Sequence, residues 1–353
     1  MIVDTLSLRD YRSYARLELG LQPGLVLAVG PNGAGKTNLL ESLHVATQGF
    51  SPRTRSDADL IRFGERAARV AVAGEHGSSP VETEIALRVG EAKRARLNGA
   101  ALRAAEELRS RLPTLVFTPD RLAIVKAAPA VRRAYFDRTL GRLFPSRAPV
   151  SADYAAALAQ RNGAIRRVAA GFSSREALEP WTRRVTELGH ALVAARRDLV
   201  SLLSPAFRAC AEELRLDDAE LRYEGEPVTA EQLDARLEQD LARGFTGAGP
   251  HLHDVAVVAG DRDLRSFGSQ GEQRLAVLSL LLAEADLLSD RGPAPLLLLD
   301  DVLSELDPER RAILAARLRR PGSQAFLTAT SPAALPGDPD VLVQVRPGAA
   351  AAA

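Results

Sequence analysis

The sequence predicts an α/β fold in which a mixed sheet, flanked by helices, carries an inserted helical subdomain. A short apolar strand at residues 25–29 runs into a glycine-rich loop and then into an apolar helix, which is the first half of a nucleotide-binding unit. A second apolar strand, LLLL at residues 296–299, ends in two aspartates. Between these strands the chain has the pattern of long helices. We therefore expect an N-terminal lobe at residues 1–117, a helical insertion at 118–240 and a C-terminal lobe at 241–353.

The composition favours a globular protein from a reducing compartment. The 353 residues are 46% apolar and 26% charged, with a net charge of +1, which is far from disordered or membrane compositions. The single cysteine, Cys210, cannot form an internal disulfide, and no cysteines and histidines have the spacing of a zinc site. The N-terminus lacks the apolar core of a signal peptide, and no apolar run could cross a bilayer. We expect a cytoplasmic protein without a membrane partner.

Strand patterns dominate the first hundred residues. Residues 2–29 alternate and then become apolar, with a turn at Gln22, Pro23 and Gly24. The glycine-rich loop that follows gives way to apolar residues with helical spacing from Leu39 onward. Strand patterns return between Arg69 and Leu102, with turn signals at EHGSS and LNG, and predict a small antiparallel sheet.

Helical patterns follow, and then the α/β pattern resumes. The helical stretch from residue 118 to about 240 is basic at 121–147 and acidic at 211–240. We expect its helices to break at Pro145, Pro149, Gly171, Pro180 and Pro205. After residue 245 we expect strands at 254–259, 295–301 and 324–331 and helices at 274–288 and 308–318. The alanine-rich end, residues 347–353, is expected to be frayed.

Residues 30–37 read GPNGAGKT and match the phosphate-binding pattern G-x-x-x-x-G-K-[ST] in full. The loop lies between a buried strand and a helix, which is the context that makes the match a nucleotide site. It also contains Lys36, one of only three lysines beside 43 arginines. We expect the loop amides to bind phosphate oxygens, Lys36 to reach the β- and γ-phosphates of ATP, and Thr37 to ligate Mg²⁺. The predicted nucleotide contacts of this segment are Gly30, Pro31, Asn32, Gly33, Ala34, Gly35, Lys36, Thr37 and Asn38.

Two aspartates follow the apolar strand at residues 296–299, and ligand sites of α/β proteins lie at such carboxyl ends of strands. We expect Asp300 to hold Mg²⁺ through water and Asp301 to orient or deprotonate the attacking water. The catalytic candidates are therefore Lys36, Asp300 and Asp301, and the metal ligands are Thr37 and Asp300. An acid that merely caps the next helix would be the structural alternative.

A third motif, SQGEQR at residues 269–274, resembles the signature loop of the ATP-binding-cassette superfamily. SELD at 304–307 resembles the D-loop that follows the magnesium-binding strand there. The resemblance implies a P-loop ATPase head of this type, in which Ser269 and Gly271 contact the γ-phosphate held by a second subunit. It thus implies a head-to-tail homodimer that forms with ATP. As an alternative, Ser-x-Gly before a helix is also a common N-cap.

The resemblance narrows to one family when further segments are included. These are DYRSYARLELGLQPG, SPRT, LVFTPDRLAIVKAAPAVRRAYFD and GPHLHD, which, with the three motifs, run from residue 10 to residue 307. Together they resemble the RecF family of DNA replication and repair proteins. The insertion is short and has no Cys-x-x-Cys hook, unlike the coiled coils of the related SMC-type ATPases.

The RecF resemblance implies an ATP-dependent DNA-binding clamp of recombinational repair and replication-fork recovery. Members of this family dimerise around two ATP molecules, bind double-stranded DNA near single-strand gaps and junctions, and hydrolyse ATP slowly. They act with RecR and RecO to help RecA replace single-strand-binding protein. The same likeness implies that Arg12 lies near the nucleotide.

The sequence also departs from the transporter pattern of the wider superfamily. Asp301 stands where transporter ATPases have glutamate, and its shorter side chain predicts slow turnover. No Q-loop glutamine can be located, and no histidine stands near Ala329 and Thr330, where transporters carry a switch histidine. A transporter subunit remains one alternative, which predicts no DNA binding. A small-molecule P-loop kinase is another, but it leaves SQGEQR unexplained.

Arginines supply the candidates for DNA contact, because sequence-independent duplex binding requires phosphate neutralisation. Aromatic residues total 5% and do not interleave with these arginines, which favours duplex over single-strand binding. Ion pairing with nearby acids, or docking of the insertion on the head, would be the structural alternatives. The candidates of the predicted DNA surface are Arg53, Arg55, Arg132 and Arg133, with Arg62, Arg66 and Arg138 beside them.

Overall fold

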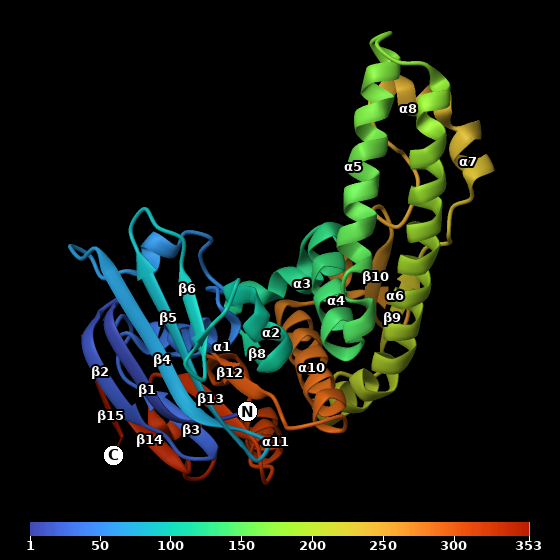
Figure 1. The fold of residues 1–353 in the computed structure, drawn as a ribbon. Helices are drawn as coiled ribbons and strands as arrows, with labels where there is room; N and C mark the ends of the chain where they lie inside the picture. Colours follow the sequence, from blue (N-terminus) through green and yellow to red (C-terminus); the bar gives the residue numbers. More distant parts are fainter. Residues whose placement is uncertain (353) are drawn as a thin grey trace. The chain divides into compact units, whose positions relative to one another are not determined.

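The computed structural model describes residues 1–352, apart from the side chain of Glu106. The chain forms two compact units (Figure 1). The first comprises Met1–Arg121, Glu213–Arg215 and the chain from Leu278 onward, and the second comprises Leu122–Glu212 and Leu216–Val277. Both ends of the chain therefore belong to the first unit.

A mixed six-stranded sheet is the centre of the first unit. Its order is β15-β14-β3-β13-β12-β8, and all neighbours are parallel except the β14–β15 pair. Strands β8, β12 and β13 are buried along their whole length, which is why apolar residues predominate in them and do not alternate with exposed polar ones. The bounds are β3 (Gly24–Val29), β8 (Thr114–Phe117), β12 (Leu296–Leu299), β13 (Gln324–Ala329), β14 (Val341–Arg346) and β15 (Ala349–Ala352).

A second, antiparallel sheet of the first unit has the order β2-β1-β4-β5-β6-β7. Its strands alternate between buried and exposed residues, because one face packs on the core and the other faces solvent. The predicted sheet between Arg69 and Leu102 is confirmed, and it is widened by the first two strands of the chain. The bounds are β1 (Ile2–Tyr11), β2 (Tyr14–Gly20), β4 (Ala67–His76), β5 (Ser79–Arg88), β6 (Arg94–Leu97) and β7 (Ala100–Ala101).

Helix α1 (Lys36–Gln48) contacts strands of both sheets, and its apolar side joins their common core. Thr83 in β5 donates a hydrogen bond from its hydroxyl to the carbonyl of Ala46, at 2.9 Å. The other helices of this unit are α2 (Leu108–Arg111), α11 (Pro308–Leu318) and the part of α10 (Gln270–Ser289) from Leu278 onward. Short 3-10 turns lie at Asp57–Leu60, Ala105–Glu107, Pro119–Leu122, Leu303–Glu305 and Pro332–Ala334.

Helices dominate the second unit. Figure 1 shows α5 and α6 side by side, and Tyr154, Val185 and Leu192 lie in the apolar cluster between them. A three-stranded sheet, β11-β10-β9, completes the unit. The bounds are α3 (Ala123–Lys126), α4 (Pro129–Leu143), α5 (Val150–Ala169), α6 (Glu179–Glu213), β9 (Ala219–Glu224), α7 (Ala230–Ala235), α8 (Leu237–Arg243), β10 (Asp254–Ala259), β11 (Arg262–Asp263) and α9 (Leu264–Phe267), with 3-10 turns at Pro145–Arg147 and Arg175–Leu178.

Three expectations for these elements are wrong. Helix α6 begins at Glu179, so the break expected at Pro180 coincides with its start, but the helix does not break at Pro205, where buried Leu203 and Phe207 hold both sides of the proline in the core. The acidic stretch after α6 contains a strand, β9, because it pairs with β10 along its length. The alanine-rich end is not frayed up to residue 352, because β15 pairs with β14.

The compact units also differ from the expected parts of the chain. The expected limit at residue 117 lies close to the end of the first segment at Arg121. The expected limit at residue 240 falls inside the second unit, because the pairing of β9 with β10 ties residues on both sides of it together. No helix within residues 1–352 is long and apolar enough to cross a membrane.

Candidate nucleotide site

The glycine-rich loop connects the carboxyl end of β3 to the first residue of α1. Gly35 caps α1 in the left-handed region, with φ at 108°, and no side chain accepts a hydrogen bond from the first turn. A Cβ atom on Gly30 would lie 2.3 Å from the carbonyl oxygen of Val345 in β14. The loop therefore requires glycine at both positions, and the amides at the start of the helix are available for an anion.

Lys36 is held across this loop by backbone carbonyls. Its Nζ donates hydrogen bonds to the oxygens of Gly30, at 2.7 Å, and Pro31, at 3.0 Å. These acceptors are neutral, and negatively charged phosphate oxygens would bind the same ammonium group more strongly. The lysine is thus positioned over the loop before any ligand arrives.

Thr37 and Asp300 come together beside the loop, as predicted. The Thr37 hydroxyl lies 3.0 and 3.1 Å from the two carboxylate oxygens of Asp300. The sheet order explains the contact, because β12 and β3 both flank β13 and run parallel, so their carboxyl ends share one edge. A hydroxyl and a carboxylate are hard oxygen donors, and this pair fits Mg²⁺, which binds few protein ligands and keeps its waters and phosphates.

Thr328, at the end of β13, holds both aspartates and was not found from the sequence. Its hydroxyl donates to Oδ1 of Asp300 at 2.7 Å and accepts from the backbone N–H of Asp301 at 2.9 Å. Asp300 is 6% exposed, and burial raises its pKa, against the hydrogen bonds from Thr328 and Thr37 that lower it. A cation beside this carboxylate would offset the cost of burying its charge.

Asp301 has a different environment from its neighbour. Its backbone is left-handed, with φ at 50°, which aspartate tolerates better than most residues, and its carbonyl accepts from the Ser304 hydroxyl at 3.0 Å. The residue is exposed, whereas Asp300 is buried. The left-handed backbone at Asp301 therefore turns the chain, so that Asp300 is buried and Asp301 is exposed.

Arg12 is linked to α1 through Glu41, a buried acid that sequence reasoning missed. Its guanidinium donates two hydrogen bonds to the Glu41 carboxylate, both at 2.8 Å, and one to the carbonyl of Asp59, at 2.8 Å. Glu41 is fully buried, and it also accepts from the Ser51 hydroxyl at 2.5 Å and from Arg53 at 3.4 Å. The sequence signal that could have selected Glu41 is an acid that stands one helical turn after Thr37 on an apolar helix. Its partners, however, lie far away in the sequence.

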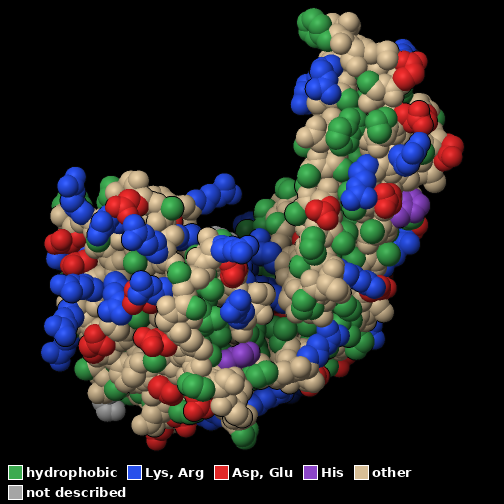
Figure 2. Space-filling view, in the orientation of Figure 1, with side chains coloured by type: hydrophobic (Ala, Val, Ile, Leu, Met, Phe, Trp, Pro, Cys, Tyr) green, Lys and Arg blue, Asp and Glu red, His purple; other side chains and the backbone are tan. Residues whose placement is uncertain are grey.

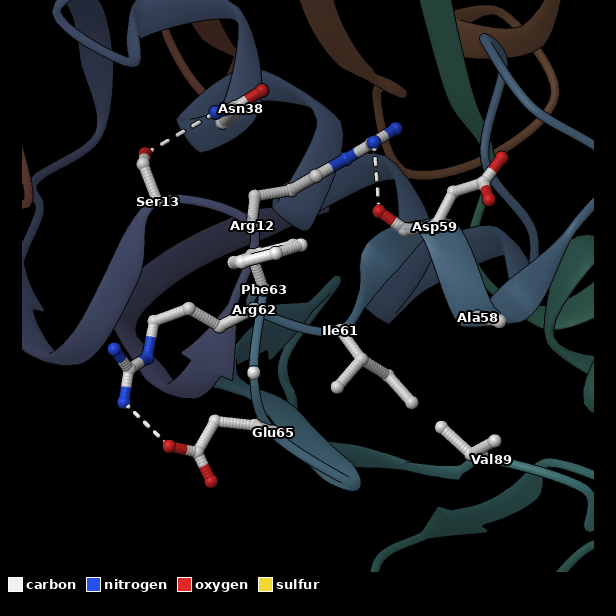
Figure 3. Close-up of a pocket in the computed structure, with 11 residues that line it drawn as sticks. Arg12, Ser13, Asn38, Ala58, Asp59, Ile61, Arg62, Phe63, Glu65 and Val89 are labelled. Atoms are coloured by element: carbon white, nitrogen blue, oxygen red, sulfur yellow. Dashed lines mark hydrogen bonds and ion pairs between the residues drawn. The ribbon is translucent and has the colours of Figure 1, made fainter.

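A pocket of about 650 Å³ opens next to the first turn of α1 (Figure 3). Arg12, Ser13 and Asn38 form its polar wall, and the Asn38 amide donates to the Ser13 hydroxyl at 3.2 Å. Ile61 and Val89 lie on another side of it, and Phe63 is fully exposed at its rim. The volume is that of a small-molecule site. No sequence pattern selected Ile61, Phe63 or Val89 as site residues.

The signature loop belongs to the second unit. Ser269 and Glu272 form reciprocal hydrogen bonds at the start of α10, from the Ser269 N–H to the carboxylate at 2.8 Å and from the Glu272 N–H to the hydroxyl at 3.2 Å. Gln273 fixes the preceding turn by donating to the carbonyl of Leu264, at 2.8 Å. Ser269 and Gly271 are exposed, so both can meet a group from outside this unit.

Comparison with known proteins identifies the family of this chain. The family model described as RecF/RecN/SMC N terminal domain matches residues 2–349. The chain is 35% identical to the DNA replication and repair protein RecF of Heliobacterium modesticaldum over 344 residues, 94% of this chain and 92% of that protein. It is 38% identical to RecF of Anaeromyxobacter dehalogenans strain 2CP-C over 349 residues, 92% of this chain and 91% of that protein.

The chain belongs to the RecF family.

Solved structures agree with RecF membership. A structure described as the recombination mediator protein RecF-ATPrS in the RecFOR pathway superposes with a TM-score of 0.87 at 25% identity, covering 99% of this chain and 98% of that one. An Smc head bound to the C-winged helix domain of ScpA has a TM-score of 0.63 at 16% identity, which shows a shared fold alone. The predicted ATPase-head fold and the assignment to DNA repair and recombination are confirmed. A transporter subunit is not favoured.

The arginines predicted to contact DNA in this RecF-family chain have mostly internal roles. Arg132 is 2% exposed, pairs with Asp254 and donates to the carbonyl of Val125 at 2.7 Å, so it is not available to DNA. Arg133 is half-buried and donates to the carbonyl of His253 at 2.7 Å. Arg53 donates to Asn38 at 3.2 Å beside the nucleotide site. Arg55 alone of the four is exposed with no such role, within the part of the chain that the structure describes.

Proposed function

We propose that this RecF-family chain binds ATP with Mg²⁺, dimerises head to tail around two ATP molecules and in that state binds double-stranded DNA near single-strand gaps. Hydrolysis of ATP to ADP and phosphate is slow and releases the DNA. The observation that carries this proposal is the meeting of Lys36, Thr37 and Asp300 at one loop, which are the parts a phosphate–magnesium site needs.

Each part of the nucleotide has a matching part of the site. The amides of residues 33–37 and Lys36 bind the phosphates, and Thr37 and Asp300 are the protein ligands for Mg²⁺. Bound Mg²⁺ would neutralise charge on the β- and γ-phosphates. No group of three or more metal-binding side chains exists among residues 1–352, so phosphates and waters supply the remaining ligands.

The base and ribose would occupy the pocket at Arg12, Asn38 and Phe63. It begins at the first turn of α1 and combines a polar wall with exposed apolar side chains. An aromatic ring at the rim offers a surface on which a base can stack. Arg12 would then act near the nucleoside, and Glu41 would position its guanidinium.

Asp301 is the residue proposed to orient the attacking water. It stands next to the metal ligand Asp300, and its backbone is fixed by Thr328 and Ser304. A carboxylate within reach of the water can accept its proton. The side chain is one methylene shorter than glutamate, which supports a slow reaction.

The dimer is proposed because Ser269 is exposed and already ordered. Replacing Ser269 with alanine should prevent ATP-driven dimerisation, since the γ-phosphate of the partner's nucleotide loses its hydroxyl contact. Sedimentation velocity with a non-hydrolysable ATP analogue measures this change, and nucleotide binding by the monomer should stay within about twofold, as for other surface changes.

The same substitution also removes an N-cap, which is worth about 1 kcal/mol. Ser269→Asn is the matched control, because asparagine caps a helix equally well but is larger at the proposed contact. Asn should restore stability and still fail to dimerise. Dimerisation of either variant with the affinity of the unaltered chain would contradict a role of Ser269 across the dimer.

The pathway partners are proposed from the relatives. The superposed RecF structure is described within the RecFOR pathway, and from this we propose RecR, with RecO, as partners and the loading of RecA as the outcome. DNA binding is the step of the proposed function that can be tested with this chain alone.

Fluorescence anisotropy of a labelled DNA duplex with a single-stranded gap tests the proposal. The protein is titrated with and without Mg²⁺ and a non-hydrolysable ATP analogue, at two salt concentrations. Binding that requires the nucleotide and weakens with salt is the expected result. Absence of binding under every condition would overturn the proposal that the chain itself binds DNA.

A further inference from the structure

Arginines form a row across the outer face of the antiparallel sheet in the first unit. The strand register places Arg16 of β2 opposite Arg9 of β1, and Arg9 opposite Arg69 of β4. Arg69 faces Ala86 of β5, and Ala86 faces Arg94 of β6. Leu8, Leu17 and Val70, the neighbours of these arginines along their strands, point into the core. The arginines therefore share the solvent face, and we call these four residues the arginine row.

The guanidinium groups of the row are accessible and only partly neutralised. Within the part of the chain that the structure describes, Arg9 and Arg16 form no ion pair. Arg69 pairs with Glu84, at 2.6 Å, and Arg94 pairs with Glu91, at 3.1 Å. Arg88, at the end of β5, adds a further positive charge and shares Glu91 with Arg94, at 3.3 Å. Five arginines thus stand against three acids along this line, which are Glu84, Glu91 and Asp10.

A groove follows the same line of residues. Its volume is about 250 Å³, and Arg9, Arg69, Arg88 and Arg94 line it together with small side chains such as Ala67 and Ala86. The alanines leave space between the guanidinium groups instead of filling it. The groove is therefore shallow, basic and able to admit a linear group.

Charge on this face is sorted along the strands. Farther from the row, the same face carries Glu18, opposite Ser7, and Glu82, opposite Ala73. Glu18 accepts a hydrogen bond from the Ser7 hydroxyl at 2.8 Å. Figure 2 shows blue Lys and Arg side chains gathered over the part of the first unit where β1, β2 and β4 lie in Figure 1. Acids also lie among these side chains, and Arg96 stands opposite Glu84 outside the row, so the face carries an excess of positive charge along the row and not positive charge alone.

We propose that the arginine row binds the phosphate backbone of duplex DNA. This rests on the proposed function, and it assigns the contact to a surface distinct from the arginines that the sequence suggested. Arg16 to Arg94 covers four strand spacings, about 19 Å at about 4.8 Å each. A duplex presents one negative charge per about 1.7 Å of its axis, so a straight basic row of this length meets several phosphates.

The chemistry of the row favours DNA over an acidic protein surface. Protein interfaces are held mainly by a few Trp, Tyr and Arg side chains that are buried in desolvated pockets, whereas the arginines of the row stand exposed on an open sheet face. The groove is lined by arginines, by alanines and Leu87, and by the acids Asp10 and Glu91, and none of its lining residues is aromatic. Arginine forks match phosphate oxygens, and contacts of this kind carry no sequence preference.

The test compares Arg9→Ala/Arg16→Ala with the unaltered chain in the presence of Mg²⁺ and a non-hydrolysable ATP analogue. Binding of a labelled gapped duplex is measured at several salt concentrations. The double variant should bind about tenfold more weakly at low salt, and the slope of log affinity against log salt should fall by about 1.8, because each lost phosphate contact contributes about 0.9.

Two further variants make the result specific. Arg9→Lys/Arg16→Lys keeps both positive charges, so its DNA affinity should depend on salt almost as steeply as that of the unaltered chain. This comparison tests the row even if the alanine variant does not fold. Arg291→Ala/Arg320→Ala removes two exposed charges that precede β12 and β13 in the other sheet, and it should bind DNA like the unaltered chain.

Outcomes separate this inference from the proposed function. If the unaltered chain binds DNA and Arg9→Ala/Arg16→Ala binds with the same affinity and slope, the row is not the DNA surface and the proposed function stands. If the Arg291→Ala/Arg320→Ala control lost the same DNA affinity, the change in net charge alone would explain the weaker binding. The proposal that the arginine row contacts DNA would then be wrong. If neither the unaltered chain nor any variant binds DNA under any condition, both proposals fail.

Discussion

Replacing Lys36 with alanine is expected to abolish ATP binding without unfolding the chain. In the structure the Lys36 ammonium bonds only to two loop carbonyls, so its removal should lower the free energy of unfolding by about 1 kcal/mol. With ATP bound, the same group would form two charge-assisted bonds to phosphates, worth about 1.5–3 kcal/mol each. Loss of both corresponds to an affinity about 10²- to 10⁴-fold lower. Titration with a fluorescent ATP analogue measures the affinity, and thermal unfolding measures the stability.

The scarcity of lysine in this chain supplies a matched control. Lys126 in α3 is exposed and belongs to the second unit, whereas the loop belongs to the first. Lys126→Ala removes the same side chain, and it should leave ATP affinity within about twofold, as for most surface substitutions. Retention of tight binding by Lys36→Ala would contradict the assignment of the loop as the phosphate site.

The nucleotide loop was predictable because its information is local. Strand, glycine-rich loop and helix follow one another within residues 24–48, and the structure reproduces them. The helix at 308–318 was likewise predicted to the residue, because Asp307 caps it and Pro308 occupies its first position. Where local pattern and tertiary packing agree, the sequence alone is sufficient.

The partners of the site residues were not predictable, because they depend on which strands are neighbours. Thr328 holds Asp300 only because β13 lies beside β12, a fact of sheet order that no periodicity contains. Glu41 became visible as a site residue only when Arg12, 29 positions earlier in the chain, was found bonded to it. Both are polar residues in apolar surroundings, and such residues need a partner that only the fold supplies.

The arginines also show that the sequence alone does not reveal which residues the fold brings together. Charge runs in the sequence selected Arg132, which the fold uses to tie α4 to β10 through Asp254. The register of the antiparallel sheet instead brings together Arg9, Arg16 and Arg69, which are scattered over 61 residues. Linear charge density therefore does not identify a surface that is assembled across strands.

Replacing Asp301 with asparagine is expected to lower the rate of ATP hydrolysis by about 10²- to 10⁴-fold, because a general base of this kind contributes about that much. Asparagine has the same shape, tolerates the left-handed backbone at φ 50° and keeps the N–H that binds Thr328. ATP affinity should therefore change little, so that kcat falls while the nucleotide still binds. Single-turnover release of phosphate, beside equilibrium titration of a non-hydrolysable analogue, separates the two quantities.

Asp300→Asn should behave differently, and the contrast makes the assignment of roles testable. Asp300 is buried against Thr37 and is proposed to ligate Mg²⁺, so its neutralisation should weaken Mg²⁺-dependent ATP binding itself. Asp290→Asn, an exposed acid just after α10, removes the same charge elsewhere in the first unit and should change neither quantity. If Asp301→Asn hydrolysed ATP at the rate of the unaltered chain, another group would have to orient the water. The slow turnover that we propose could then not be attributed to the short side chain at this position.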